Sequence, residues 1–361
     1  MRVALLDLPS YTPPYDHSLA AALARRGHDV TVLTSRSPYG KAPAPERYRR
    51  EELFFALSGR WRRRAPRSPV HRLVKAAEYY PSLVRMRRRL DAVGPDVVHV
   101  QWLALPERDV GWLRAEARPK VFTAHDLLGR RPKRRDTWLA VCRAVDRVVV
   151  HSGAGRDELT AAGVDPDRVA VIPHPVFASS AQEPSPPNGT TLLFFGLLRA
   201  YKGLDVLIRA LPQIPGARVV IAGDPLDPVE PLQRLAHDQG VAGRIEWRLG
   251  FLPDAEIAKL LAEAAAVVLP YRRADSSGVL ATALGHGRPV VVSDVGGLAE
   301  SVRAYGAGRA VPPDDPSALA EACRALLDDL EPAYEGALAA RGALGWDAAA
   351  EAHERVYGSI V

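Results

Sequence analysis

Residues 194–205 read FFGLLRAYKGLD. An apolar strand runs into Gly196, and a short loop that carries Arg199 and Lys202 leads into a new helix. This order brings two cations and the free N–H groups of a helix start to the carboxyl end of a strand, which suits a phosphate group. The stretch therefore predicts a strand–loop–helix unit of an α/β fold with an anion site at the strand's end.

A second loop of this kind follows the apolar strand expected at 266–269. Its polar and small residues are Asp275, Ser276, Ser277, Gly278 and Val279, the last of which opens a helix. In the first loop, arginine offers a fork for two phosphate oxygens and lysine a compact charge. Without an anion between them, two cations at a helix start would oppose the helix dipole by about 0.3–1 kcal/mol. The two loops together predict a site that holds a diphosphate from two sides.

The length of 361 residues exceeds one ordinary core and predicts about two domains. Short apolar runs alternate with helical patterns, as in βαβ units with strands covered on both faces. We expect an N-terminal domain at 1–178, a turn-rich linker at 179–190, a second domain at 191–343 and a C-terminal helix at 344–361 that packs back on the first domain. Expected strands are 3–6, 30–33, 97–100, 121–124, 147–150, 169–172, 192–195, 218–222, 245–247, 266–269, 290–292 and 309–311.

Helices of the first half are expected at 17–25, 70–92, 137–144 and 155–162, and residues 35–69 as a loop with a short helix. Cys142 and Cys323 lie in different halves and without metal-ligand spacing, which favours two buried reduced thiols and a cytoplasmic protein. The N-terminus lacks the apolar region of a signal peptide, and no apolar run reaches the ~18–20 residues of a membrane span. We therefore expect a cytoplasmic location, with the inner face of the membrane as an alternative.

Charge is divided unevenly between the halves. Residues 1–180 hold 32 Lys and Arg against 19 Asp and Glu, a balance of +13, and residues 181–361 hold 16 against 23, a balance of −7. Arginine clusters lie at 60–64, 85–89 and 130–135. A solvated basic face, an anionic membrane surface and an anionic acceptor each agree with this pattern. Nucleic acid is not expected as a partner, because no aromatic platform or recognition helix accompanies the charge.

Several motifs occur in order along the second half: FFGxxRxYKGLD at 194–205, IAGD at 221–224, GFL at 250–252, LPY at 269–271, SSGV at 276–279, GRPVV at 287–291 and DVGGLAE at 294–300. In the first half, the segments at 11–17 and 23–30, Ala124-His125-Asp126 and IPHPV at 172–176 continue the series. Taken together, the series resembles the retaining glycosyltransferases of family 4. Their fold, GT-B, has two Rossmann-like domains with an interdomain cleft and a C-terminal helix that crosses back.

The resemblance implies transfer of a sugar from a nucleotide diphosphate sugar to an acceptor, with retained anomeric configuration and without an essential metal or any cofactor besides the nucleotide-sugar co-substrate. The catalytic candidates are His125, Arg199 and Lys202. The donor-binding candidates are Gly196, Gly223, Asp224, Gly250, Phe251, Tyr271, Asp275, Ser276, Ser277, Gly278, Val279 and Thr282. The acceptor-side candidates are Tyr11, Tyr15, Asp16, His17 and Asp126, for an acceptor that is unknown, with lipid-linked and anionic compounds as the alternatives.

Two departures from the family pattern stand out. Pro13-Pro14-Tyr15-Asp16 replaces a Gly-Gly pair of the first loop, which predicts a loop shaped for the acceptor. Ala274 and Thr282 replace two glutamates, so Asp275 and the hydroxyl of Thr282 are the groups left to approach the donor. The alternatives are a catalytically silent subunit that binds nucleotide sugars and a sugar-nucleotide epimerase. A dinucleotide-dependent oxidoreductase is disfavoured, because no GxGxxG turn follows a strand. His151, His174 and His286 are read as structural.

Overall fold

The computed structural model describes residues 1–37, 42–58, 70–126, 134–178 and 183–361, and side chains within α3 from residue 73 onward. The chain forms two compact units. Unit 1 comprises Met1–Val150, Arg156–Ile172 and Trp346–Val361, and unit 2 comprises His151–Gly155 and Pro173–Gly345. The arginine cluster at 60–64, residues 130–133 of the third cluster and residues 179–182 of the expected linker lie outside the described residues.

Unit 1 is built on a parallel sheet. In the described part of the unit its strands lie in the order β3-β2-β1-β4-β5-β6-β7, and apolar side chains such as Leu6, Val100 and Phe122 form its core. The strands are β1 (Arg2–Asp7), β2 (Asp29–Ser35), β3 (Arg49–Phe54), β4 (Val97–Trp102), β5 (Lys120–Thr123), β6 (Arg147–Val150) and β7 (Val169–Val171). The helices are α1 (Pro13–Arg25), α3 (Val70–Val93), α4 (Pro106–Ala115), α5 (Arg135–Arg143), α14 (Trp346–Gly358) and most of α6 (Gly153–Ala161).

Two expectations for unit 1 are wrong. Residues 49–54, expected in a loop, form the edge strand β3. Most side chains of this strand are charged, as is common at a sheet edge, so it lacks the apolar run by which the other strands were predicted. Glu51 of this strand pairs with Arg89, and Arg49 pairs with Asp29 of β2, which holds the edge in place. The expected loop at 13–16 is instead the first turn of α1, because proline is preorganised for the first helical positions. Helix α4 was also not anticipated, and it begins with a proline as well.

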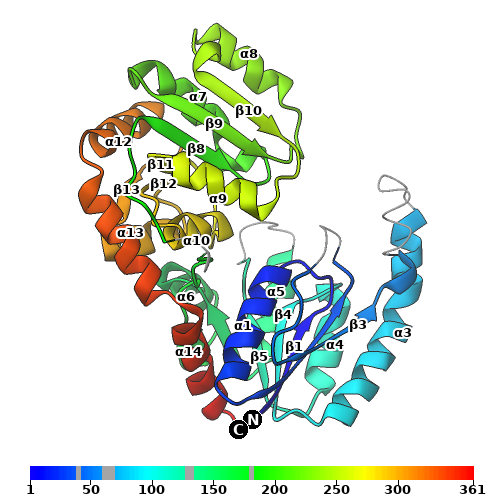
Figure 1. Cartoon of the computed structure of the whole chain (residues 1–361). Coiled ribbons are helices and arrows are strands. Elements are labelled where there is room, and N and C mark those ends of the chain that lie inside the picture. Colours follow the sequence, from blue (N-terminus) through cyan, green and yellow to red (C-terminus); the bar gives the residue numbers. More distant parts are fainter. Residues whose placement is uncertain (38–41, 59–69, 127–133, 179–182) are drawn as a thin grey trace. The chain divides into compact units, whose positions relative to one another are not determined.

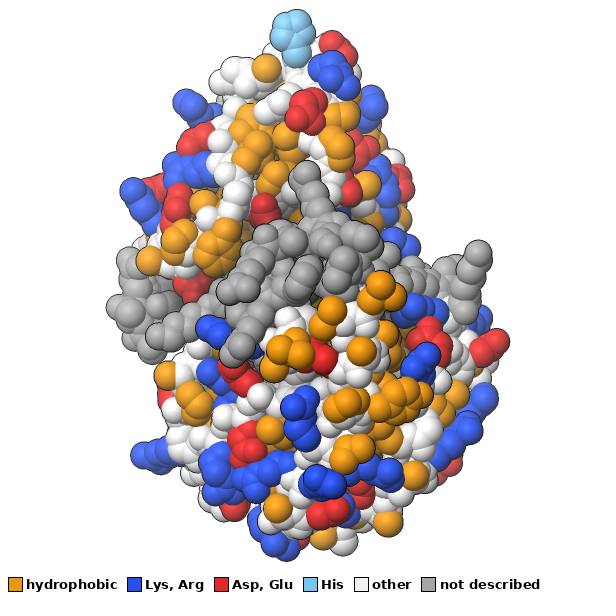
Figure 2. Space-filling model, turned by 90° about the vertical axis from the view of Figure 1, so that its right-hand side faces the viewer, with side chains coloured by type: hydrophobic (Ala, Val, Ile, Leu, Met, Phe, Trp, Pro, Cys, Tyr) orange, Lys and Arg blue, Asp and Glu red, His pale blue; other side chains and the backbone are white. Residues whose placement is uncertain are grey.

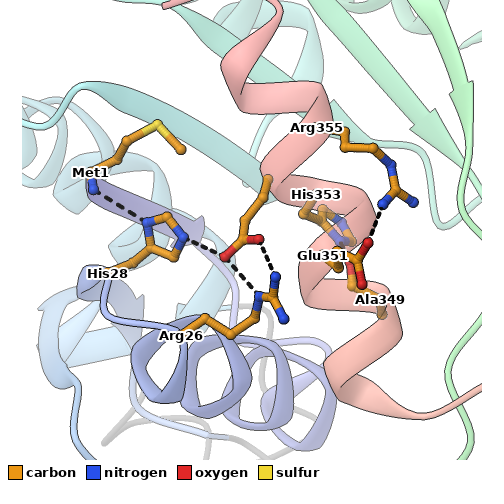
Figure 3. Close-up of polar contacts among 8 residues, drawn as sticks. Met1, Arg26, His28, Ala349, Glu351, His353 and Arg355 are labelled. Carbon is orange, nitrogen blue, oxygen red and sulfur yellow. Dashed lines mark hydrogen bonds and ion pairs between the residues drawn. The ribbon is translucent and has the colours of Figure 1, made fainter.

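Helix α14, the last of the chain, belongs to unit 1 and packs against α1 (Figure 1). The guanidinium of Arg26 donates to both carboxylate oxygens of Glu354 at 2.8 and 2.6 Å. His28 bridges the same carboxylate, at 2.7 Å, and the terminal amine of Met1, at 3.3 Å (Figure 3). These contacts lower the pKa of Glu354 to about 2, with the Arg26 hydrogen bond as the main cause. The last helix is therefore fastened to the first one by a charged cluster.

Unit 2 is built on a second parallel sheet, which in its described residues has the strand order β10-β9-β8-β11-β12-β13. The strands are β8 (Thr191–Phe195), β9 (Arg218–Gly223), β10 (Ile245–Leu249), β11 (Ala266–Leu269), β12 (Val290–Ser293) and β13 (Gly308–Val311). The helices are α7 (Leu204–Ala210), α8 (Glu230–Asp238), α9 (Asp254–Glu263), α10 (Gly278–Gly285), α11 (Leu298–Tyr305), α12 (Pro316–Asp328) and α13 (Glu331–Ala343). Figure 1 shows helices on both faces of this sheet.

The predicted fold class, α/β with two Rossmann-like halves, is confirmed by these two parallel sheets. Residues 173–178 belong to unit 2, because the amides of Val176 and Phe177 donate to the carbonyls of Leu344 and Ala281. Cys142 and Cys323 are buried and unbridged, as expected. Among the described residues, no helix combines the length and the apolar character that a membrane crossing requires.

Candidate functional site

A glycine stands at the carboxyl end of each of three neighbouring strands in unit 2. Gly196 follows β8, Gly223 ends β9 and Gly250 follows β10, with φ of +104°, +140° and +119°. The amide of Gly250 donates to the carbonyl of Gly223, and the amide of Gly196 to that of Ala222, both at 2.9 Å. A Cβ on Gly223 would lie 2.0 Å from the carbonyl oxygen of Gly196. No larger residue fits there, and the edge leaves room for a ligand to approach the main chain closely.

Lys202 is buried beside this edge, with only 6% of its surface exposed. It ends a 3-10 turn at Ala200–Lys202, and Gly203, in the left-handed conformation, passes the chain into α7. Its Nζ lies 5.2 Å from the centre of the Tyr271 ring and 3.0 Å from the position that a Cβ on Gly196 would occupy. A buried ammonium over a ring face is a fixed cation that a diphosphate can reach at the strand edge.

Arg199 differs from Lys202, since it is exposed and has extended backbone just before the 3-10 turn. The turn begins only at Ala200, so the two cations lie in different surroundings. Sequence reasoning missed Arg272, which donates to both oxygens of Asp205, at 2.9 and 2.7 Å, and to the carbonyl of Ala200 at 2.7 Å. Arg272 therefore fixes the turn that carries Lys202, and its place directly after Pro270-Tyr271 was the available signal.

The second loop of unit 2 ends in a helix cap. The hydroxyl of Ser277 accepts from the amide of Leu280 at 3.2 Å, which begins α10 at Gly278. The amides of Gly278 and Val279 lie in the first turn, where no intrahelical acceptor exists. The methyl Cγ2 of Val279 lies 3.0 Å from the position of a Gly196 Cβ, the same position that Lys202 approaches. The helix start and the buried cation thus meet at one strand edge.

Other donor-side candidates occupy different surroundings. The hydroxyl of Thr282 donates to the carbonyl of Gly278 at 2.7 Å, so its proton is already engaged. Tyr271 is buried, which raises the pKa of its hydroxyl. Asp224 is exposed, and Phe251 is 75% exposed beyond Gly250.

A pocket next to the second loop brings in two histidines that the sequence assigned to structure. Asp275, Ser276 and Ser277 line it together with His151 and His174, whose ring centres lie 5.0 Å apart. Burial lowers the pKa of His174 to about 4, so this ring is neutral near pH 7. Arg199 and Lys202 are not among the residues that line this pocket, which therefore lies beside the strand edge described above.

His125 of unit 1 lies just beyond β5 between aromatic rings. Its ring stacks on Trp102 at a centroid distance of 5.2 Å and meets the edge of Tyr15 at 4.7 Å. Tyr15 in turn packs against Trp346, the first residue of α14, at 5.0 Å. Only 9% of His125 is exposed. His125 lies at the end of a strand, as predicted, and two aromatic residues far apart in sequence, Tyr15 and Trp102, hold its ring plane.

A buried chain of hydrogen bonds leads from His125 to α14. Nε2 of His125 donates to Oε1 of Gln101 at 2.8 Å, because an amide oxygen can only accept. The amide nitrogen of Gln101 lies 3.1 Å from Nε2 of His99, whose Nδ1 is hydrogen-bonded to the hydroxyl of Tyr357 at 2.7 Å. Thr123 joins the same His99 at 2.7 Å. Sequence reasoning missed Gln101, although it is the residue before the last one of β4, the strand adjacent to β5.

The acceptor-side candidates are largely covered. Tyr15 and Asp16 are 2% and 4% exposed, and burial together with the carboxylate of Asp7 raises the pKa of Asp16 well above its ordinary value. His17 is hydrogen-bonded to the hydroxyl of Tyr48 at 2.9 Å, and its pKa is lowered by burial. Tyr11 is 46% exposed and meets Trp102 edge-on, and Asp126 is half-buried beside His125.

Among the side chains that the structure describes, no three from His, Cys, Asp or Glu are grouped closely enough to hold a metal ion. The polar groups at the two strand edges are amides, hydroxyls, imidazoles, cations and the separate carboxylates of Asp126, Asp224 and Asp275. Such a set recognises anions and sugar hydroxyls by hydrogen bonds.

Comparison with known families gives two matches. The model described as "Glycosyltransferase Family 4" matches residues 15–179, and the model described as "Glycosyl transferases group 1" matches residues 189–329. Among curated proteins, D-inositol 3-phosphate glycosyltransferases of Mycobacterium bovis and Mycobacterium tuberculosis are 31% identical over 243 residues. The match covers 58% of this chain and 49% of those proteins, so the chain spans about half the length of the curated relatives it matches.

Solved structures share the fold over the whole chain. Sucrose-phosphate synthase from Thermosynechococcus elongatus aligns with a TM-score of 0.77 at 21% identity, covering 99% of this chain and 98% of that one. HepE from Anabaena, solved in complex with UDP, aligns with a TM-score of 0.73 at 18% identity, covering 99% and 100%. At these identities the likeness concerns the fold.

Proposed function

Because this chain belongs to the family 4 glycosyltransferases, the glycosyl transferases of group 1, we propose that it transfers a hexosyl group from a nucleotide diphosphate sugar to an acceptor hydroxyl. Retention of the anomeric configuration and independence of metal are part of the proposal. The observation that carries it is the meeting of Lys202, the bare backbone at Gly196 and the helix start at Val279. These groups suit a diphosphate better than a neutral ligand.

The reacting bond joins the anomeric carbon of the sugar to an oxygen of the diphosphate. As this bond breaks, its electron pair goes to the diphosphate, the acceptor oxygen forms the new bond to the same carbon, and the proton of the acceptor hydroxyl passes to the departing diphosphate. Charge therefore accumulates on the leaving group, where Lys202 is already fixed and needs no rearrangement. One well-placed group of this kind contributes about 3–4 kcal/mol to the transition state. We assign the same task to Arg199, whose exposed side chain must first be ordered by the ligand.

His125 is assigned to a hydrogen bond with a donor-sugar hydroxyl or with the reacting group. Its ring plane is held by Trp102 and Tyr15, and Gln101 determines which nitrogen carries the proton of the neutral ring. A neutral ring protonated at Nε2 has its lone pair at Nδ1. In this tautomer Nδ1 is the ring nitrogen that is able to accept a hydrogen bond. The curated relatives named for D-inositol 3-phosphate support an anionic acceptor.

A catalytically silent subunit that binds nucleotide sugars is the second candidate. One observation favours it, since the hydroxyl of Thr282, which stands where many relatives carry a glutamate, donates to Gly278 instead of facing a ligand unpaired. An epimerase of the same fold would consume a sugar nucleotide without an acceptor. The silent subunit forms no product, and the epimerase forms an isomerised sugar nucleotide instead of a glycosylated acceptor. One product assay therefore separates both alternatives from transfer.

The test uses the full chain with chelator present. UDP-, GDP- and ADP-sugars are screened by thermal shift, and the best donor is then incubated with candidate acceptors, including inositol phosphates and lipid-linked sugars. We expect a donor to raise the melting temperature, and a glycosylated acceptor whose anomeric configuration matches the donor by NMR. Binding without any product with any acceptor would favour the silent subunit, acceptor-free isomerisation would favour the epimerase, and restoration of activity only by added metal would contradict the metal-independent mechanism.

A further inference from the structure

Helix α3 of unit 1 has two apolar faces. One face, with Tyr79, Met86 and Leu90, is buried in the core of the unit. The other face carries Leu73 and Tyr80, which are 73% and 58% exposed, and Val84, which is 50% exposed. Residues seven and four apart lie on the same side of a helix, so these three side chains form one outer stripe.

Leu57 is a further exposed apolar residue in a turn attached to α3. The amides of Leu57 and Ser58 donate to the two carboxylate oxygens of Glu78, at 2.7 and 2.8 Å, which fastens this turn to α3. The side chain of Leu57 is nevertheless 60% exposed. A helix of a water-soluble unit normally turns its polar face outward, so large apolar side chains on this side need an explanation.

Unpaired arginines lie beside the same stripe. Arg85, Arg87 and Arg88 are exposed on the last turns of α3, and the guanidinium of Arg108 lies 5.7 Å from the ring centre of Tyr80. None of these four forms an ion pair with a described carboxylate, whereas Arg89 pairs with Glu51 and Arg118 with Asp91. The acidic side chains of the helix, Glu78 and Asp91, are engaged elsewhere, so among the described residues the stripe is bordered by arginines that no carboxylate pairs with.

We propose that this outer face of α3 docks on an anionic lipid surface. An interfacial helix places its apolar side chains about 5–10 Å into the boundary between headgroups and acyl chains, while its arginines contact lipid phosphates. Tyr80 suits that boundary because its ring is apolar and its hydroxyl, which accepts from Arg108 at 3.4 Å, is polar. Figure 2 shows this side of unit 1, with hydrophobic side chains gathered among Lys and Arg.

Lipid fits this face better than an acidic protein does. Leu73, Tyr80 and Val84 project from a single convex helix, and a protein partner would need a groove matched to that shape. A fluid lipid surface adapts to it. The excess of +13 over residues 1–180 also favours a partner with many negative charges spread over an area. The inference concerns location and stands apart from the chemistry proposed for the site.

The experiment measures flotation of the full chain with vesicles of phosphatidylcholine alone and of phosphatidylcholine with phosphatidylglycerol. We expect binding to the anionic vesicles at low salt, weak binding to the neutral ones, and loss of binding as salt shortens the screening length. Arg87→Ala with Arg88→Ala should weaken binding about 25-fold, taking about fivefold for each arginine. Leu73→Ser with Tyr80→Ser and Val84→Ser should abolish it.

Matched controls use exposed residues of unit 2 and the far side of unit 1. Arg234→Ala with Arg309→Ala, and Val171→Ser, should leave binding unchanged, and thermal melting should show that all variants fold. Failure of the wild type to bind anionic vesicles at low salt would overturn the proposal, as would equal losses in the α3 variants and the controls. Self-association that only the α3 variants abolish would assign the face to a second copy of the chain and would equally overturn it.

Discussion

The two strand edges that carry the candidate residues are built on opposite principles. In unit 2 the edge consists of glycine backbone, helix amides and the cation of Lys202, all contributed by loops that directly follow their strands. In unit 1 His125 is held by side chains of β4, α1 and α14, which meet only in the folded unit. An anion can be held by local backbone and charge, whereas the orientation of an imidazole needs several fixed neighbours. We therefore expect that activity depends in unit 2 on single side chains such as Lys202. In unit 1 we expect it to depend also on the residues that pack behind His125 and orient it.

The largest effect is expected at Lys202. Lys202→Ala should lower turnover by about 100- to 1,000-fold, because the fixed cation next to the leaving diphosphate is lost. Steady-state kinetics with the best donor measure it, and circular dichroism checks the fold. Lys259→Ala, which removes an exposed lysine of α9, is the control and should retain wild-type turnover. Turnover above a tenth of wild type in Lys202→Ala would contradict the assignment.

The second prediction concerns the layer behind His125. Gln101→Leu should reduce kcat by about ten- to 100-fold with little change in the KM of the donor, because the ring loses the acceptor that fixes it. Gln101→Glu keeps an oxygen for Nε2–H and should retain most of the activity, with a pH profile displaced upward because a carboxylate stabilises a protonated ring. Tyr357→Phe removes the far end of the chain and should cost less than Gln101→Leu.

A purely structural role of Gln101 would give another pattern. In that case the loss of kcat would follow the loss of melting temperature across the three variants, and the pH profile of Gln101→Glu would coincide with that of the wild type. Either result would show that Gln101 does not position His125. It would also contradict the proposed difference between the two strand edges.

The third prediction concerns the fastening of α14 in unit 1. Glu354→Gln should lower the free energy of unfolding by about 1 kcal/mol at pH 7. This figure is smaller than the lowered pKa alone would give, because solvent screens part of the carboxylate charge. The pKa of Glu354 is about 2 in the folded state, below the ordinary 4.5, so its stabilisation is complete above pH 4.5 and disappears as the pH falls toward 2. Urea titrations at pH 7 and at pH 3.5 should show the difference between wild type and variant shrinking.

Glu351→Gln is the matched control, one turn away on the same helix. Its carboxylate accepts a hydrogen bond from the exposed Arg355 at 2.7 Å (Figure 3), and such a pair contributes roughly a few tenths of a kcal/mol. Equal effects of the two substitutions would mean that the cluster around Glu354 adds nothing beyond ordinary surface charge.

The smallest effect is expected at Thr282. Thr282→Val should change the KM of the donor by less than about threefold, because the hydroxyl proton is already donated to Gly278 and only a lone pair is left for a ligand. Donor titration with Thr282→Ser as the control measures it. A rise in KM beyond about tenfold, with Thr282→Ser unaffected, would show that this hydroxyl contacts the donor strongly despite its internal bond.

The α/β class, the strands other than β3 and the composition of the unit 2 edge could be predicted from the sequence alone. Apolar runs of buried parallel strands are legible without a structure, and a glycine, a cation and a helix cap that follow a strand stay beside it in any fold. Sequence reasoning failed at β3, whose charged residues carry no apolar pattern, and at residues 13–16, where two prolines start a helix. No sequence pattern indicates that Lys202 is buried while Arg199 is exposed, a difference that arises because the 3-10 turn begins between them. Likewise, Gln101, His99 and Tyr357 line up behind His125 because parallel strands and a returning helix bring together residues that no sequence spacing relates.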